Sequence, residues 1–226
     1  MNAKQRAANA ALDEIRDGMI VGLGSGSTAD CFIDALGAAL NAKRFRNLRG
    51  VATSNNSDER ARKLGINVIS LADAKQIDVT VDGADEIDTR LNLIKGLGGA
   101  LLREKIVAQN SKHIVIIADH SKKVEVLGTQ SPLPVEVVKF GFELHEHFLQ
   151  QLGCEPTLRR TADGQPYVTD NDNYIYHCRF KHIDQPAVLE ATLRKRAGIV
   201  ESGLFVGIAS IALVANENDI ERIERK

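Results

Sequence analysis

The 226-residue chain has no tryptophan, only three cysteines and no excess of charge of either sign. Cys31, Cys154 and Cys178 are far apart, odd in number and without a C-x-x-C pair, so neither a disulfide framework nor a thiolate zinc site is expected. The six histidines give no better case for a metal, because His145 and His147 stand two apart on an expected helix and point away from each other. The sequence therefore implies no metal and no cofactor.

Charge and hydropathy argue against two kinds of partner. The 29 basic and 30 acidic residues give a net charge of −1, which argues against a nucleic-acid-binding surface. The longest hydrophobic runs fall well short of the roughly 20 residues that a membrane-spanning helix needs. The first residues, MNAKQR, lead into an amphipathic helix and lack the apolar region of a signal peptide. We expect a cytoplasmic protein with no nucleic-acid or membrane partner.

Short apolar runs alternate with helical patterns through the first half of the chain. Such alternation predicts a Rossmann-like α/β domain, in which helices cover both faces of a parallel sheet. The expected strands are 19–23, 51–54, 66–71, 77–81 and 113–118, and the expected helices are 4–15, 29–40, 54–64 and 100–109. Three strand ends, at 22–28, 82–85 and 119–122, would then lie along one carboxyl edge, where open α/β sheets bind ligands.

The pattern changes near residues 131–134 to the order β-α-β-β-α-β, which is typical of a smaller ferredoxin-like α+β domain. Its expected strands are 135–140, 156–160, 174–180 and 199–205, and its expected helices are 142–152 and 187–196. Because it has no acidic cluster and no glycine-rich anion loop, we interpret it as a structural or oligomerisation domain. A strand at 208–214 and a terminal helix at 219–226 should return to the first domain. The predicted domains are therefore 1–130 with 206–226, and 131–205.

The turn GLGSGST at 22–28 joins an expected strand to an expected helix. Glycines let the backbone approach a ligand, the helix start offers N–H groups, and Ser27 and Thr28 add hydroxyl donors, so the turn predicts an anion site. A dinucleotide fingerprint would have its third glycine one position later than Gly26, and no acidic residue ends the next strand. A phosphate monoester therefore fits better than NAD, although Ser27 and Thr28 could equally serve as caps.

The stretch VDGADEIDTRLNLIKGLGGALLREKI at 81–106 has the strongest chemical signal. Asp82 and Asp85 follow a buried strand, and Lys95 precedes a glycine-rich turn. Glu104 stands one turn inside the next helix, between aliphatic neighbours. Because apolar surroundings disfavour the ionised form of a glutamate, a residue so placed suits a general base. The alternative is that the aspartates are turn residues and that Glu104 lies on a solvated helix face.

Five motifs resemble those of the type A ribose-5-phosphate isomerases, in the same order and with similar spacing. They are GLGSGST at 22–28, VDGADE at 81–86, KGLGGALLREK at 95–105, ADHSK at 118–122 and LPVEV at 133–137. The resemblance covers nearly the whole chain. It implies an enzyme of the non-oxidative pentose phosphate pathway that interconverts ribose 5-phosphate and ribulose 5-phosphate through an enediolate. It also implies a homodimer or homotetramer formed through the second domain.

The resemblance implies roles for individual residues. Glu104 would be the proton acceptor, and Asp82 and Asp85 would bind sugar hydroxyls and assist ring opening. Lys95 would stabilise the enediolate oxygen, and Lys122 would contact the sugar. The residues expected to bind the substrate, including those that would hold its phosphate at 25–28, are Lys4, Ser25, Gly26, Ser27, Thr28, Asp82, Gly83, Ala84, Asp85, Lys95, Gly96, Leu97, Gly98 and Lys122.

Two residues depart from the family pattern. Leu97 stands where members often have glycine, and His120 where a smaller or acidic residue is common. Leucine would be harmless at position 97 if only its backbone were used. Two other classes of function stay open: a non-catalytic sugar-phosphate sensor, which would not need Glu104 and Lys95 together, and a sugar-phosphate deaminase or coenzyme A transferase of similar topology.

Overall fold

A computed structural model describes residues 1–225, and its contacts divide the chain into two compact units. The first unit comprises Met1–Ala84, Arg103–Lys122 and Gly207–Lys226, and the second comprises Asp85–Leu102 and Lys123–Val206. The second unit thus contains the range 131–205 together with the segment that begins at Asp85.

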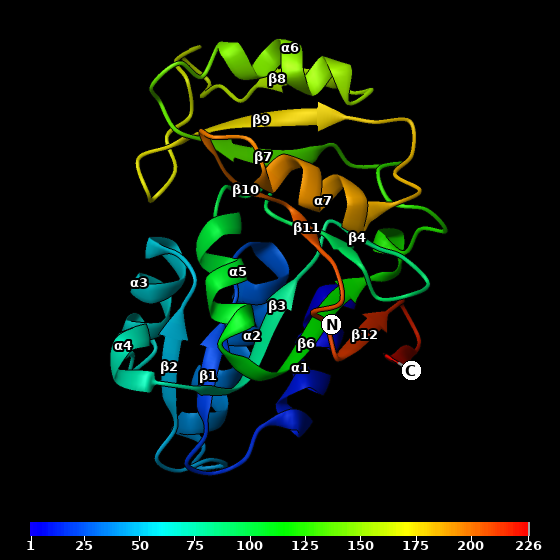
Figure 1. Ribbon diagram of the computed structural model, residues 1–226. Helices are drawn as coiled ribbons and strands as arrows, with labels where there is room; N and C mark the ends of the chain where they lie inside the picture. Colours follow the sequence, from blue (N-terminus) through cyan, green and yellow to red (C-terminus); the bar gives the residue numbers. More distant parts are fainter. Residues whose placement is uncertain (226) are drawn as a thin grey trace. The chain divides into compact units, whose positions relative to one another are not determined.

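The first unit is built on a six-stranded sheet in the order β13-β12-β6-β3-β1-β2 (Figure 1). All neighbouring strands are parallel except the edge strand β13, which is antiparallel to β12. The strands are β1 (Ile20–Leu23), β2 (Arg49–Ala52), β3 (Ile77–Gly83), β6 (Ser111–Asp119), β12 (Ile211–Ala215) and β13 (Ile220–Glu224). The helices are α1 (Ala3–Ala11), η1 (Leu12–Glu14), α2 (Ser27–Asn41), α3 (Asn55–Lys63), α4 (Leu71–Ala74), α5 (Leu101–Gln109) and η2 (His120–Lys122). The predicted Rossmann-like class is confirmed.

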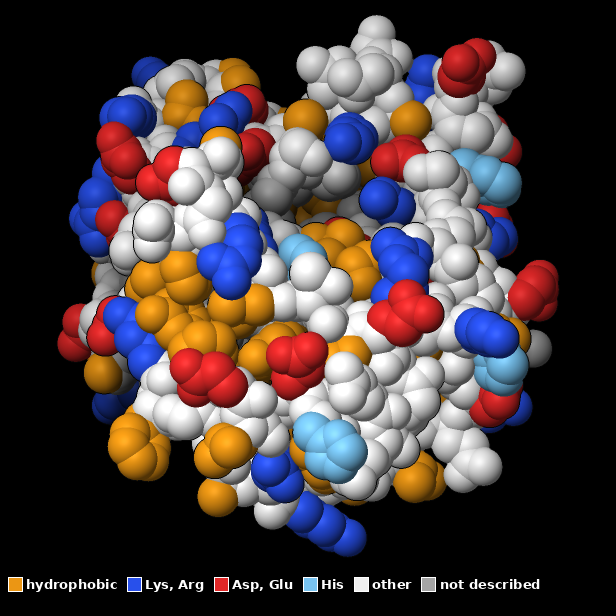
Figure 2. Space-filling model, turned by 90° about the horizontal axis from the view of Figure 1, so that it is seen from above, with side chains coloured by type: hydrophobic (Ala, Val, Ile, Leu, Met, Phe, Trp, Pro, Cys, Tyr) orange, Lys and Arg blue, Asp and Glu red, His pale blue; other side chains and the backbone are white. Residues whose placement is uncertain are grey.

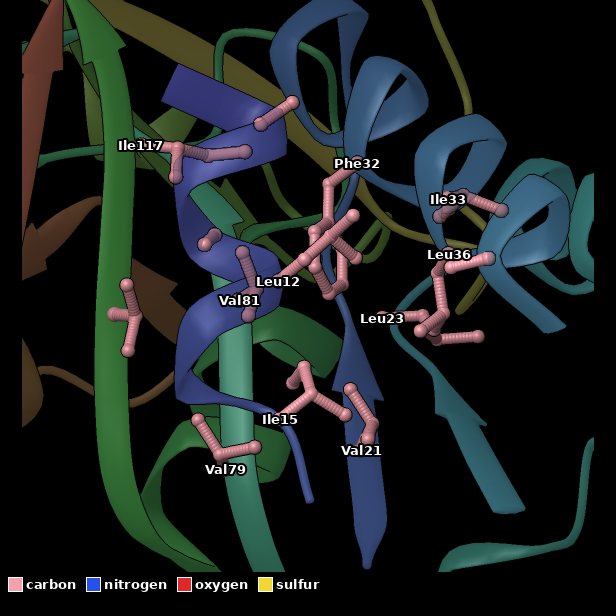
Figure 3. Close-up of a cluster of buried hydrophobic side chains, with 14 of the residues drawn as sticks. Leu12, Ile15, Val21, Leu23, Phe32, Ile33, Leu36, Val79, Val81 and Ile117 are labelled. Atoms are coloured by element: carbon pink, nitrogen blue, oxygen red, sulfur yellow. The ribbon is translucent and has the colours of Figure 1, made fainter. Parts of the chain in front are cut away.

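Alternate residues of β1 point to opposite faces of the sheet, as the pleat requires. Val21 and Leu23 pack in the cluster that contains Phe32 of α2 and the buried side chains of α1 (Figure 3). Ile20 packs with Val107 of α5 in a separate cluster. Because helices cover both faces, the central strands must be apolar along their length.

Two predicted elements of the first unit are wrong. The strand expected at 66–71 is a single bridge between Val68 and Gly50, and α4 begins at Leu71 after Ser70, whose hydroxyl accepts the N–H of Asp73. The helix expected at 219–226 is instead β13, and position 226 lies outside the described residues. A helix of about eight residues is marginal without tertiary packing, whereas β13 gains a ladder along the free edge of β12.

The second unit contains a four-stranded antiparallel sheet in the order β10-β7-β9-β8. Its elements follow the expected β-α-β-β-α-β order: β7 (Leu133–Val137), α6 (Leu144–Gln151), β8 (Glu155–Leu158), β9 (Tyr174–Arg179), α7 (Pro186–Arg194) and β10 (Ile199–Ser202). A second sheet has the order β11-β5-β4, with β4 (Glu86–Ile87), β5 (Leu93–Ile94) and β11 (Leu204–Phe205).

The strand expected at 199–205 divides at Gly203 between these two sheets. The Gly203 carbonyl accepts the N–H of Lys95 at 2.9 Å, and a Cβ atom at Gly203 would overlap the Lys95 carbonyl. Glycine is therefore required where the chain passes from one sheet to the other.

Figure 2 shows one face of the molecule on which basic and acidic side chains are interspersed. Among residues 1–225, no helix has both the length and the apolar composition needed to cross a membrane.

Glu136 of β7 is a fully buried carboxyl group that faces Glu201 of β10 in the strand ladder. The hydroxyl of Thr169 and the side-chain amide of Asn173 each donate to its Oε1 at 2.9 Å. Burial raises the pKa of Glu136, and the negative charge of Glu201 adds to the rise, although the hydrogen bonds oppose it. The folded chain therefore holds this proton more tightly than the unfolded chain does.

Stability should consequently fall as the pH rises above the ordinary glutamate pKa of about 4.5 and through the raised value. Glu136→Gln keeps the shape of the side chain but cannot ionise, so it should flatten this part of the pH dependence. Urea unfolding midpoints between mildly acidic and neutral pH would measure the slope. The exposed Glu125 provides the control Glu125→Gln, and an equal slope in the Glu136 variant and the wild type would contradict the prediction.

Candidate active site

The carboxyl ends of β1, β3 and β6 lie at the same edge of the first unit's sheet. Leu23 pairs with Val81, and Gly83 pairs with Ile117, so the three strands are in parallel register up to this edge. The glycine-serine loop follows β1, Asp82 and Gly83 end β3, and η2 follows β6. The structure thus brings together three segments that the sequence pattern placed at one edge.

The glycine-serine loop leads directly into α2. Gly26 is the N-cap with φ 95°, a conformation that L side chains rarely adopt, and no side chain of the described residues caps this helix start. Lys4 Nζ donates to Ser27 Oγ at 2.9 Å, which places a positive charge beside the first turn. Backbone N–H groups, the helix dipole and a lysine together make a suitable site for a phosphate.

Asp82 is part of the same loop structure. Asp82 is 2% exposed, and its Oδ1 accepts the N–H of Ser25 at 3.1 Å and the N–H of Gly83 at 2.7 Å. A Cβ atom at Gly24 would overlap this carboxylate, so Gly24 is required for the close approach. A Cβ atom at Gly83 would lie 3.8 Å from the Cβ of Thr28. The end of β3 and the first turn of α2 therefore lie close together.

Two residues that support the loop were not predicted from the sequence. The hydroxyl of Ser25 contacts Thr53 Oγ1 at 2.8 Å and donates to Ser54 Oγ at 2.7 Å. Thr53 in turn donates to the carbonyl of Leu23 at 2.9 Å. The sequence feature that could have indicated these two residues is the run of hydroxyl residues directly after β2, because β2 is the neighbour of β1 in the sheet.

Glu104 lies on the buried side of α5 and is 4% exposed. Val107, one turn further along, packs in the apolar cluster on this face of the sheet, and residues three apart share a helix face. The adjacent Arg103 is only partly buried, and its side chain donates to Asn55 Oδ1 at 2.9 Å. A solvated position for Glu104 is therefore excluded.

In the second unit, Asp85 holds the glycine turn that follows β5. The N–H of Asp85 donates to the carbonyl of Ile94 at 2.8 Å, and its Oδ2 accepts the N–H of Leu97 at 3.0 Å. Position 97 thus contributes its backbone N–H to this contact. Leucine supplies this N–H as well as glycine would.

Lys95 is buried in the second unit, with 3% of its surface exposed. Its ammonium group lies 5.4 Å from the centre of the Phe205 ring, a distance at which the ring face attracts a cation. Gly96 follows with φ 95°. The chain can therefore turn sharply after the lysine without strain.

Comparisons with known proteins decide the family. The sequence model of the family described as ribose 5-phosphate isomerase A (phosphoriboisomerase A) matches residues 49–219. The chain belongs to this family. The ribose-5-phosphate isomerase A of Synechococcus sp. strain JA-3-3Ab is 47% identical over 98% of this chain and 96% of its own length. That of Gloeobacter violaceus is 49% identical over 96% of this chain and 94% of its own length.

Solved structures of ribose 5-phosphate isomerases have the same fold. A D-ribose-5-phosphate isomerase in complex with phospho-erythronic acid is 37% identical and aligns with a TM-score of 0.97, covering 100% of both chains. The ribose 5-phosphate isomerase of Plasmodium falciparum is 34% identical with a TM-score of 0.95, covering 99% of this chain and 98% of its own.

The remaining acid of the family motif, Glu86, has a structural position. It is fully buried and accepts the backbone N–H groups of Gly128, Gln130 and Ser131 at 2.6, 2.7 and 2.6 Å. Glu86 therefore anchors the segment before β7, which gives this acid a structural role.

The other expected substrate-binding residues of this isomerase-family chain are accessible to different degrees. Lys122 ends η2 and is partly exposed, as are Ala84 and Leu97, whereas Gly98 is exposed. Within the described part of the chain, no three or more histidine, cysteine or acidic residues are grouped so as to hold a metal ion.

Proposed function

We propose that this chain interconverts ribose 5-phosphate and ribulose 5-phosphate. The observation that carries the proposal is the burial of Glu104, 4% exposed, in a chain of the ribose-5-phosphate isomerase A family. Phospho-erythronic acid, bound to a related isomerase, supports it, because a phosphorylated acid has negative charge at both ends, as a phosphorylated enediolate does.

We assign the proton transfer to Glu104. In the opened aldose, its carboxylate removes the proton from C2, and the electrons of the C2–H bond form the enediolate. The resulting carboxylic acid returns a proton to C1, which completes the ketose. The proton on the C2 oxygen must move to the C1 oxygen, and we assign this step to Asp82 and Asp85. Lys95 would stabilise the negative oxygen of the intermediate, as positioned cations do.

We assign the substrate's phosphate to the start of α2 and to Lys4, whose ammonium group lies 2.9 Å from Ser27 Oγ. Lys4→Met should raise KM by about tenfold and leave kcat within about twofold, because a hydrogen bond to a charged group contributes about 1.5–3 kcal/mol. Steady-state kinetics with ribose 5-phosphate would measure both constants. Lys63→Met, at an exposed position on α3, is the control, and a loss confined to kcat would count against the assignment.

Mixing the protein with ribose 5-phosphate in deuterated water, without added cofactor, tests the proposed reaction. An isomerase should form ribulose 5-phosphate and introduce solvent deuterium into the sugar, which nuclear magnetic resonance would detect. Binding of ribose 5-phosphate without any ketose would favour a sugar-phosphate sensor instead, and would refute the proposal.

We also propose a homodimer or homotetramer formed through the second unit. Phe140 and Leu144, between β7 and the first turn of α6, are 94% and 72% exposed, and exposed apolar groups of this kind favour a protein interface. Sedimentation of the wild type and of a Phe140→Lys variant would test it. A monomeric wild type would contradict this assembly. A cytoplasmic location stays a prediction from the sequence.

A further inference from the structure

The helices α3 and α5 cover opposite faces of the first unit's sheet. Ala61 of α3 packs in the cluster that contains Leu23, and Val107 of α5 packs with Ile20 in the other cluster. Because Leu23 and Ile20 are three residues apart on β1, their side chains point to opposite faces. Apolar packing therefore holds the two helices separately, although the proposed reaction needs Glu104 of α5 at a fixed distance from the phosphate site.

The first turn of α3 is tied to the glycine-serine loop. Thr53 donates its N–H, at 3.1 Å, and its hydroxyl, at 2.9 Å, to the Leu23 carbonyl. Ser54 is the N-cap of α3: its Oγ accepts the N–H of Ser57 at 3.1 Å, and the Ser57 hydroxyl oxygen accepts the N–H of Ser54 at 3.0 Å. The hydroxyl of Ser25 contacts both Thr53 and Ser54. The start of α3 is therefore a hydrogen-bonded support for the loop.

A hydrogen bond joins the start of α3 to α5. Arg103 Nη1 donates to Asn55 Oδ1 at 2.9 Å. Asn55 is the first residue of α3, and Arg103 immediately precedes Glu104 in the first turn of α5. The division between the two units falls between Leu102 and Arg103, so Arg103 is the first residue of α5 in the unit that contains the loop. The bond thus connects helices on opposite faces at the residue next to the proposed base.

We propose that Arg103 and Asn55 are positioning residues for Glu104. Their hydrogen bond fixes the first turn of α5 to the start of α3, and thereby holds Glu104 at a set distance from the phosphate site. Binding of phosphate does not need this bond, whereas proton transfer does, since a displacement of about 1 Å can cost about 10²-fold in rate. The catalytic consequence rests on the proposed function, in which Glu104 is the base, whereas the anchoring of α5 does not.

The kinetic test compares wild type, Arg103→Met, Asn55→Ala and the double variant, all as the full chain. Each single variant should lower kcat about tenfold and leave the inhibition constant of inorganic phosphate within about twofold of the wild type. The double variant should lose no more kcat than the more impaired single variant, because both substitutions remove the same bond. Asn55→Asp keeps the acceptor oxygen and should retain kcat within about twofold.

Amide hydrogen exchange measures the anchoring of α5 without turnover. The backbone N–H groups at 105–107 lie in the first hydrogen-bonded turn of α5. Their exchange should be about threefold faster or more in Arg103→Met and Asn55→Ala, because a turn that is less firmly held opens more often. Arg62→Met is the matched control, since Arg62 donates to Asp58 on the exposed surface of α3. It should leave kcat and this exchange unchanged.

An unaltered kcat in Asn55→Ala would overturn the proposal, as would a loss confined to KM or losses that multiply in the double variant. If Arg103→Met does not fold, Asn55→Ala and Asn55→Asp still decide, because position 55 is exposed. Failure of the proposed function would differ, since the wild type would not convert ribose 5-phosphate while the two substitutions still accelerated exchange in α5.

Discussion

Glu104→Gln should lower kcat by about 10²-fold or more while leaving the dissociation constant for ribose 5-phosphate within a few-fold of the wild type. Glutamine has nearly the same shape but cannot accept the proton, and a positioned general base contributes a factor of about 10² to 10⁴. Because Glu104 is 4% exposed, bulk water has little access to replace it. Ketose formation would measure kcat, and titration calorimetry would measure binding.

Glu104→Asp separates the proton transfer from the shape of the site. The shorter side chain keeps the carboxylate but moves it, and a displacement of about 1 Å can cost about 10²-fold in rate. We expect this variant to retain more activity than Glu104→Gln. Thermal unfolding of both variants would check that the fold is intact. A glutamine variant whose turnover stays within a few-fold of the wild type would remove Glu104 from its proposed role.

Lys95→Ala should lower kcat by about 10²-fold or more and raise KM much less, since loss of a group that stabilises developing charge costs about 3–4 kcal/mol in the transition state. Lys95 is 3% exposed with its ammonium group over the Phe205 ring, so water cannot readily replace its charge. Initial rates over a range of ribose 5-phosphate concentrations would give both constants.

Lys95→Met is the companion variant, because its side chain keeps apolar packing beside Phe205 and removes only the charge. If the charge is what matters, it should lose as much kcat as Lys95→Ala does. A change confined to KM in both variants would show that Lys95 contributes equally to binding the substrate and the transition state.

The spacing of apolar residues along the chain predicted the elements that are buried by regular packing, namely the central strands and the helices that cover them. The central strands are apolar throughout because helices cover both faces, and Glu104 could be placed among apolar neighbours from helical spacing alone. The strand at 66–71 and the terminal helix could not be predicted correctly, because the free edge of β12 and the bridge at Gly50 decided them. The two-residue strands β4 and β5 are also too short for a periodic signal.

By itself, the sequence determined the α/β order of the chain, the glycine-serine loop and the position of Glu104 one turn inside its helix. These follow from the periodicity of apolar residues and from backbone conformations that side chains disfavour. Only the tertiary structure decided that Thr53 and Ser54 support Ser25, and that Glu86 accepts backbone N–H groups of the segment before β7. Such contacts join segments far apart in the chain, and no local pattern specifies which distant side chain fills the space beside a given residue.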